Sequence, residues 1–263
     1  MIKTDMIDLI ANELYEAEKK KQSVEKFTGK FPELNETLAY EVQERLIELK
    51  VMEEKTKRVG RKLGLTSKPK QIAMGVHEPS YGVLLESMQL FEGESISIKP
   101  FIHARVEPEI AFIFKKELKG PYVSPADVLA ATEYVAPALE IIDSRFHGFT
   151  FSLSDAVADN SSSSRFILGE RFYHPANLDL RLMGMVFKKN GDVMATGAGA
   201  AVMGHPARAI AWLANKLYKT GQSIQPGEVV LSGSLSAAAV IAPGDQFTAS
   251  FDGIGSVDAF FTE

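Results

Sequence analysis

The sequence of 263 residues contains no cysteine, which excludes disulfide bonds and metal sites built on thiolates. Its five histidines stand far apart, so no pair of them has the spacing typical of a zinc site. The formal net charge is −5 and the chain has no basic stripe, which argues against nucleic acid as a partner. Oxygen atoms therefore remain the main candidates for metal ligands.

Long apolar runs are also missing. No run approaches the length of a transmembrane helix, and the first five residues include an acid rather than the apolar core of a signal peptide. Hydrophobic residues make up 45% of the chain and charged residues 24%, as in ordinary globular proteins. We therefore expect a cytoplasmic protein that binds neither membranes nor nucleic acid.

Common catalytic motifs are absent as well. Gly197 and Gly199 begin a glycine-rich stretch, but Val202 occupies the third glycine position of a dinucleotide-binding loop. The chain shows neither a Ser-His-Asp order nor a G-x-S-x-G elbow. We expect the glycine-rich stretch to allow close backbone packing beside a site.

The patterns that are present predict an α+β protein. Apolar residues at helical spacing predict helices over residues 5–22 and 36–54, the second with Asn35 as its N-cap. From about residue 94 the pattern is rich in strands, with buried strands expected at 105–114 and 134–142. We predict a small helical N-terminal unit over residues 1–57 and a larger, strand-rich domain over residues 58–263.

Acidic residues occur inside the two predicted buried strands. Glu107 and Glu109 lie two residues apart, which places both carboxylates on one face of the first strand. Glu140 lies within the second strand. Three buried carboxylates that converge are typical of a site for a hard divalent cation. The alternative, equally open at this point, is that these acids form ion pairs with arginines, namely Arg105, Arg145 or Arg165.

Lys62 and Arg165 are candidates for contacts with an anion. Lys62 lies between two glycines in an apolar stretch, where it either binds an anion or is a solvated lysine on a strand edge. Arg165 ends the serine-rich loop 158–165, directly before an apolar run, and a guanidinium there can grip a carboxylate with two hydrogen bonds. The loop itself is either a solvated connection or a set of hydrogen-bond donors around a ligand.

Several motifs, in this order, resemble the hydratase/decarboxylase branch of the fumarylacetoacetate hydrolase superfamily. They are GRKLGLTSK at 60–68, EPE at 107–109, PALEIIDSR at 137–145, ADN at 158–160, GAGAA at 197–201 and GIGS at 253–256. The resemblance runs from about residue 5 to the C-terminus. It implies a mixed, β-rich fold built around a β-roll with flanking helices.

The resemblance also implies a site. Mg²⁺ or Mn²⁺ would be held by Glu107, Glu109 and Glu140. Lys62 and Arg165 would take part in catalysis, and substrate contacts would come from Leu65, Ser161 and Ser234.

Two activities occur in this branch, and both act on short acids from the breakdown of aromatic rings. One is the decarboxylation of 2-oxohex-3-enedioate (4-oxalocrotonate), and the alternative is the hydration of 2-hydroxypenta-2,4-dienoate to 4-hydroxy-2-oxovalerate. Hydratases of the branch usually carry an aspartate at the position of Ser80, so this sequence favours decarboxylation. The expected partner is a small 2-keto dicarboxylic acid. We also expect a homo-oligomer and leave open a complex with a partner hydratase.

Overall fold

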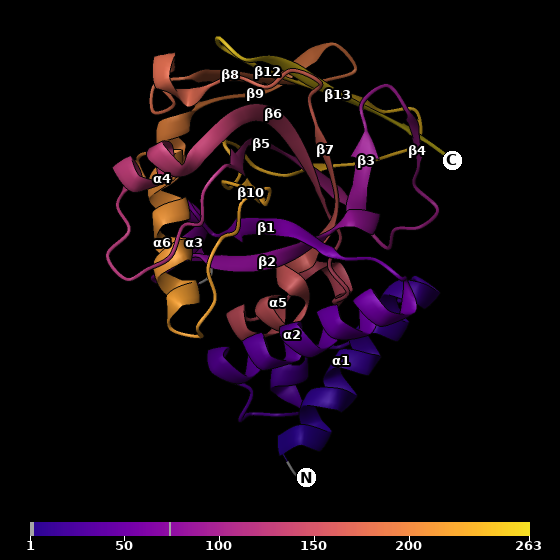
Figure 1. Ribbon diagram of the computed structural model, residues 1–263. Helices are drawn as coiled ribbons and strands as arrows, with labels where there is room; N and C mark the ends of the chain where they lie inside the picture. Colours follow the sequence, from indigo (N-terminus) through magenta and orange to yellow (C-terminus); the bar gives the residue numbers. More distant parts are fainter. Residues whose placement is uncertain (1–2, 74) are drawn as a thin grey trace.

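The computed structural model describes residues 3–73 and 75–263. A strongly curved sheet forms its centre (Figure 1), and most neighbouring strands in it are antiparallel. Along the sheet the strands are β2 (Ser80–Leu85), β1 (Arg58–Gly64), β10 (Val229–Leu231), β5 (Arg105–Phe114), β6 (Thr132–Ile142), β7 (Ser163–Leu168) and β3 (Gln89–Phe91), and β11 (Ala239–Val240) pairs with β5.

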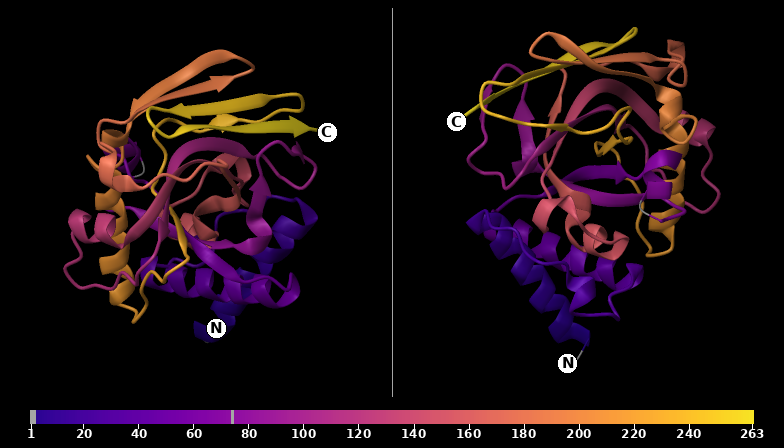
Figure 2. Two further views of the ribbon diagram at one scale, coloured as in Figure 1. Left: turned by 45° about the horizontal axis from the view of Figure 1, so that its top comes forward. Right: turned by 180° about the vertical axis from the view of Figure 1, so that it is seen from behind.

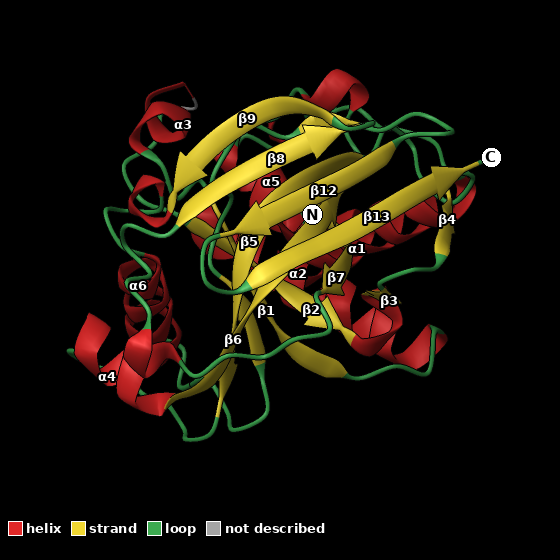
Figure 3. Ribbon diagram, turned by 90° about the horizontal axis from the view of Figure 1, so that it is seen from above, coloured by secondary structure: helices red, strands yellow, loops and turns green. Residues whose placement is uncertain are grey.

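A second sheet covers the first, as the view from above shows (Figure 3). Its strands are β4 (Ser95–Ser97), β13 (Gly255–Thr262), β12 (Gln246–Phe251), β8 (Gly184–Lys189) and β9 (Asp192–Ala198). Buried phenylalanines from both sheets, among them Phe112, Phe187 and Phe247, belong to one large core. Burial of large apolar side chains is the main favourable term in folding, so this core holds the two sheets together.

The hairpin between β8 and β9 follows from two residues. Asn190 and Gly191 both adopt positive φ, as a two-residue turn between antiparallel strands requires. Close packing of backbone explains Gly197, within β9, and Gly199, just after it: a Cβ would lie 2.6 Å from the carbonyl oxygen of Leu235 and 1.8 Å from that of Leu180. The prediction of close backbone packing in this stretch is confirmed.

Helix α6 (Pro206–Tyr218) flanks the curved sheet, and α4 (Pro125–Ala131) packs beside it (Figure 2). Both begin with proline after a capping residue, because proline lacks the N–H that would otherwise go unpaired in the first turn. Ser124 caps α4 and His205 caps α6 through side-chain acceptors.

Helices α1 (Lys3–Lys20) and α2 (Glu36–Glu53) lie at the opposite end of the molecule from the second sheet (Figures 1 and 2). They share a core with α5 (Leu153–Ala158), in which Leu14 and Leu46 pack with Phe146 and Val157. The N-terminal helices therefore bury their apolar faces against the later part of the chain. The division of the chain at residue 57 stays a prediction.

Gln43 links α2 to that later part. Its side chain is buried, and the amide nitrogen donates to the backbone oxygens of Tyr81 and Val157, both at 2.9 Å. Across residues 3–73 and 75–263, no helix is long and apolar enough to cross a membrane. The predicted α+β fold with a curved sheet and flanking helices is confirmed.

Candidate metal and substrate site

The three acids meet where β5 and β6 pair. Glu107 lies directly opposite Glu140 in the antiparallel register, and Glu109 follows on the same face of β5. One carboxylate oxygen from each residue lies within 4.8 Å of the other two, and all three side chains are buried. Within the described part of the chain, this is the single group of three acids, histidines or cysteines placed to hold a metal ion.

The unpaired oxygens of this cluster show what it can hold. Glu109 Oε1 and both oxygens of Glu140 are buried and have no hydrogen-bond partner among the described residues. The other oxygen of Glu109 accepts a hydrogen bond of 2.6 Å from the backbone N–H of Gly233. Buried carboxylate oxygens without donors carry a large desolvation cost, which a hard divalent cation with oxygen ligands removes. The residues present therefore fit Mg²⁺ or Mn²⁺.

The pKa values agree with a site built for a cation. Burial, and the nearby charge of Glu140, raise the pKa of Glu109 well above its ordinary value. Burial likewise raises the pKa of Glu140, although Lys62 acts in the opposite direction. Burial also opposes ionisation of Glu107, but Lys70 and Lys62 outweigh it, so the pKa of Glu107 is lowered.

Lys62 lies on β1 with its side chain only 3% exposed, so the alternative of a solvated lysine on a strand edge is wrong. Its Nζ is 3.0 Å from Glu140 Oε2, without the alignment of a hydrogen bond, and donates to the backbone oxygen of Ser161 at 3.2 Å. Burial would lower the pKa of Lys62, but the charges of Glu140 and Glu107 outweigh it and raise that pKa. Lys62 is therefore a buried ammonium beside the triad.

Lys70 is a second cation at the site, and the sequence analysis missed it. It lies on the short helix α3 (Lys68–Ala73), and its Nζ forms a 2.8 Å ion pair with Glu107 Oε1. The only signal was its place two residues beyond the GRKLGLTSK motif, in a lysine-rich stretch that is typical of a solvated helix.

A cavity of about 390 Å³ opens beside the triad. Lys62, Glu107 and Lys70 line one part of it, and two of the predicted substrate-binding residues, Leu65 and Ser161, also lie on its wall. Its remaining lining residues are Gly64, Ser80, Arg105, Ile142, Phe149, Phe151, Ala156, Ser162, Ala237 and Ala238. The serine-rich loop thus faces a cavity rather than forming a solvated connection.

The backbone of that loop is strained. Asn160, Ser161 and Ser162 all have φ between +50° and +56°, a region that non-glycine residues rarely adopt. The Asn160 side chain holds the turn by pairing with both backbone groups of Val83, at 2.7 and 2.9 Å. A Cβ on Gly82 would lie 2.5 Å from the Asn160 backbone oxygen, so only glycine fits there. Lys62 therefore has its acceptor, the Ser161 carbonyl, in a fixed position.

Arg165 is not brought to this site, which corrects the prediction of a catalytic role. On β6, Arg165 pairs with Ile141 and not with Glu140. Side chains alternate between the two faces of a sheet, so the Arg165 side chain lies on the face opposite to that of the triad. Arg165 lines a different cavity, with Tyr15 and Glu18 of α1.

The alternative in which arginines neutralise the triad is also wrong. Arg145 pairs with Asp159 in a buried ion pair, and the lysines at positions 62 and 70 are the cations that contact the triad. Arg105 stacks on Phe149, with its guanidinium carbon 4.1 Å from the ring centroid.

Ser234 is close to the site but is not part of the cavity wall. Its hydroxyl donates to the backbone oxygen of Ser236 at 2.8 Å, which closes a turn. The neighbouring Gly233 contacts the triad through its N–H, as described above. A substrate contact from Ser234 stays a prediction, whereas Ser162 lines the cavity with a buried hydroxyl that has no partner among the described residues.

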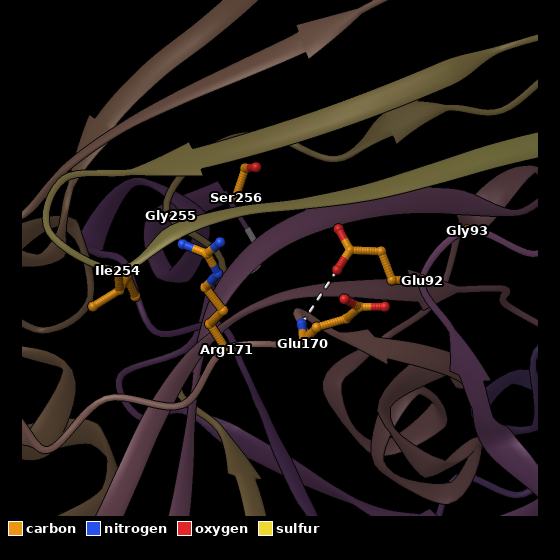
Figure 4. Close-up of a pocket in the computed structure, with 7 residues that line it drawn as sticks. All are labelled: Glu92, Gly93, Glu170, Arg171, Ile254, Gly255 and Ser256. Carbon is orange, nitrogen blue, oxygen red and sulfur yellow. Dashed lines mark hydrogen bonds between the residues drawn. The ribbon is translucent and has the colours of Figure 1, made fainter.

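A second cavity, of about 460 Å³, lies beside the Gly253-Ile254-Gly255-Ser256 turn (Figure 4). Glu92 projects into it, and its carboxylate accepts backbone N–H groups from Asp258 at 2.9 Å and Glu170 at 3.2 Å. This acid joins the two sheets, and the cavity has no cluster of metal ligands among its described residues. Gly253 and Gly255 both have positive φ and belong to the turn that joins β12 to β13, so the glycine motif serves this turn.

Comparison with known proteins shows the family of this chain. Residues 56–261 match the model of the fumarylacetoacetate hydrolase C-terminal family. The chain belongs to this family.

Relatives within the fumarylacetoacetate hydrolase family carry both kinds of name. The chain is 42% identical to the 2-hydroxyhexa-2,4-dienoate hydratase of Comamonas testosteroni over 98% of each chain. It is 41% identical to the 4-oxalocrotonate decarboxylase of Pseudomonas sp. (strain CF600), over 98% of this chain and 97% of the relative. Overall identity therefore does not separate hydratase from decarboxylase.

The same family includes a solved structure that is similar throughout. The 4-oxalocrotonate decarboxylase from Pseudomonas putida G7, complexed with magnesium and adipate, has a TM-score of 0.95 and 40% identity, with 99% of each chain covered. The resemblance of the sequence to the fumarylacetoacetate hydrolase superfamily is thus confirmed.

Proposed function

We propose that this protein is a divalent-metal-dependent decarboxylase that converts 2-oxohex-3-enedioate to 2-hydroxypenta-2,4-dienoate and CO₂. One observation carries this proposal. Among the described residues that line the cavity, Glu107 is the single carboxylate, and the neutral Ser80 lies where hydratases of the family carry an acid. Hydration needs a group that takes a proton from water, whereas decarboxylation does not.

Glu78 does not replace the missing acid. It is the nearest other carboxylate along the chain, but its Oε1 pairs with Lys216 Nζ at 2.9 Å. It lines a different cavity, with His77 and Trp212. Because its carboxylate is already paired and lies outside the site, it does not serve as the base for hydration.

Glu107, Glu109 and Glu140 would hold Mg²⁺ or Mn²⁺, since their carboxylates converge and three oxygens of Glu109 and Glu140 form no hydrogen bond within the described chain. When bound, this ion would polarise the C2 keto group and the adjacent carboxylate of the substrate. Leu65, Ser161 and Ser162 would enclose that end of the molecule, since they lie on the same cavity wall. The related decarboxylase structure with magnesium and adipate supports both the ion and a six-carbon dicarboxylic acid.

In the reaction, the bond between C5 and C6 breaks and C6 leaves as CO₂. The bonding electron pair moves through the conjugated chain to the oxygen on C2, which then takes one proton. Lys62 is a buried ammonium next to the triad, so it stabilises the negative charge that develops on this oxygen. It also holds a proton close to that atom.

The assembly and location of the protein stay predictions. A homo-oligomer, a complex with a partner hydratase and a cytoplasmic location agree with a catabolic enzyme that passes its product to a hydratase. The product of the proposed reaction is the substrate of such a hydratase, which is the chemical reason for that partner.

The test offers the protein two substrates, each with Mg²⁺. We expect CO₂ from 2-oxohex-3-enedioate, little hydrated product from 2-hydroxypenta-2,4-dienoate, and loss of activity with EDTA. Hydration without CO₂ release would establish the alternative, a 2-hydroxypenta-2,4-dienoate hydratase. Release of neither product would leave a metal-binding protein without this activity and would overturn the proposal.

A further inference from the structure

The cavity extends away from the triad, and its far part differs from the metal end. Ile142, Phe149, Phe151, Ala237 and Ala238 give it apolar walls. One charged group interrupts these walls, the guanidinium of Arg105. A substrate bound at the triad therefore has apolar walls and the Arg105 cation beside it.

Arg105 lies on the same strand as two acids of the triad, Glu107 and Glu109. It begins β5, two residues before Glu107, and thus projects from the same face of the strand as Glu107 and Glu109. Two residues of a strand span about 6.6 Å, so Arg105 lies one repeat beyond the triad. A short extended acid that is chelated at the triad would reach Arg105 with its other end.

The protein leaves Arg105 without an anion. Arg61 and Arg145 are buried arginines that pair with Glu228 and Asp159. The other two cations on the cavity wall, Lys62 and Lys70, pair with Glu140 and Glu107. Within the described chain, no carboxylate lies within ion-pair distance of the half-buried Arg105 guanidinium, which instead stacks on Phe149 at 4.1 Å. Stacking holds the plane of the guanidinium and leaves its N–H groups able to bind a carboxylate through two hydrogen bonds.

We propose that Arg105, held against the ring of Phe149, binds the distal carboxylate of the substrate and selects 2-keto dicarboxylic acids over 2-keto monocarboxylic acids. This inference rests on the proposed function, because it names the residue that distinguishes the substrate of a decarboxylase. It gives to Arg105 the role that the sequence analysis gave to Arg165.

The chemistry sets the kinetic signature of Arg105. The carboxylate that it binds is the group that leaves, and this group loses its charge as CO₂ forms. A cation that binds it stabilises the ground state at least as much as the transition state. Replacement of Arg105 by glutamine should therefore raise KM for 2-oxohex-3-enedioate while kcat stays the same or rises.

Binding of two stable acids tests the proposal without turnover. 2-Oxohexanedioate and 2-oxohexanoate have the same chelating end and chain length, but only the first has a distal carboxylate. In the presence of Mg²⁺, we expect the unmodified protein to bind the diacid more tightly. Arg105→Gln should weaken diacid binding by about tenfold to hundredfold and leave the monoacid unchanged, because a charge-assisted hydrogen-bonded pair is lost.

Two further variants sharpen the result. Arg105→Lys keeps the charge without the planar fork and should restore part of the preference for the diacid. Arg165→Gln is the matched control, since this arginine lies outside the cavity, and it should leave both affinities unchanged. An equal loss of both acids in Arg105→Gln, or a loss of the diacid preference in Arg165→Gln, overturns the proposal.

These outcomes are separable from a failure of the proposed function. If the protein hydrates the dienoate and releases no CO₂, the diacid preference and its dependence on Arg105 are still measured. If the protein decarboxylates but Arg105→Gln keeps the full diacid preference, the proposed function stands and the role of Arg105 is refuted.

Discussion

Two clusters of buried charge lie on either side of the end of β6, and the protein treats them differently. The Arg145 guanidinium donates to the carboxylate of Asp159 and, at 2.6 Å each, to the backbone oxygens of Asp159 and Asp143. At the triad, three carboxylate oxygens on Glu109 and Glu140 form no hydrogen bond within the described chain, although the Lys62 ammonium lies 3.0 Å from one of them. One cluster is complete by itself, and the other is complete only with a ligand.

The difference gives a criterion for reading buried charge. A buried ion pair whose groups are all hydrogen-bonded costs stability mainly when one partner is removed. A buried acid without donors already costs stability, and the fold keeps it although an uncharged side chain would cost less. The following predictions test this contrast, in order of the expected effect.

The largest effect is expected at Lys62, within the incomplete cluster. Lys62→Ala should lower kcat by about 100-fold to 10,000-fold, because the positioned ammonium stabilises charge and holds a proton in the reaction. Metal affinity, measured by titration calorimetry, should change little. Lys50 offers a matched control, since it is equally buried and pairs with Glu18 away from the cavity. Lys50→Ala should lower stability only, and an unchanged kcat in Lys62→Ala would remove Lys62 from the mechanism.

In the complete cluster, Asp159→Asn should destabilise the fold by about 3–5 kcal/mol, since it removes the carboxylate that is hydrogen-bonded to the buried Arg145 guanidinium, while Glu18 stays 4.0 Å away. Urea unfolding with and without Mg²⁺ measures this effect. A destabilisation below about 1 kcal/mol would show that the pair is not essential to the loop that carries it.

The opposite result is expected for the triad. Glu107→Gln, Glu109→Gln and Glu140→Gln should each weaken Mg²⁺ or Mn²⁺ binding by about 100-fold or more, because each removes an anionic ligand. Without metal, Glu109→Gln should unfold at the same or higher urea concentration, because burial and Glu140 raise the pKa of Glu109 and its ionised form is costly. If all three variants bind metal as the parent does, the site lies elsewhere.

The raised pKa values also set a pH dependence. Below the raised pKa of Glu109 and of Glu140 these carboxyls keep their protons, so metal must displace them. Affinity for Mg²⁺ should fall as the pH decreases through that range, by about tenfold per unit for each proton released. Stability without metal should change in the opposite direction and decrease as the pH rises. A metal affinity that does not change with pH above the ordinary glutamate pKa of 4.5 would contradict this.

The smallest effect is expected at Ser80. Ser80→Asp introduces the aspartate that the family resemblance predicts for hydratases, and it should raise hydration, or slow decarboxylation severalfold by placing an anion near the developing charge. Ser80→Asn is the matched control for size. If both variants act alike, the charge at this position does not choose the reaction.

Much of the fold could be predicted because periodicity is local. The strand 105–114, the helix capped by Asn35 and the Asn190-Gly191 turn depend on residues close together in the sequence, and all three are found as predicted. The stretch at Glu78–Gly82 is different. Proline and glycine are typical of turns, but Ser80 already begins the buried strand β2. Glycine is needed there for close approach to the serine-rich loop rather than for turning.

The site was predictable where one strand carries it, and not where separate elements meet. Glu107 and Glu109 share a face by spacing alone, whereas the side on which Arg165 emerges depends on its register against Ile141. Lys70 reaches Glu107 from α3, a separate element 37 residues earlier in the chain. Its sequence surroundings show a lysine-rich helix and nothing of Glu107.

The two hydrogen bonds of Gln43 have a consequence for exchanging segments between relatives. The matched family model begins at residue 56, so Gln43 belongs to a part of the chain outside it. Yet its amide joins Tyr81 to Val157, next to the loop that fixes the acceptor of Lys62. In a hybrid protein, the first 55 residues would come from another family member. The serine-rich loop should then keep its position only if the exchanged segment supplies an amide side chain in place of that of Gln43. The contacts of α2 therefore decide where segments can be exchanged, and the start of the family model at residue 56 does not.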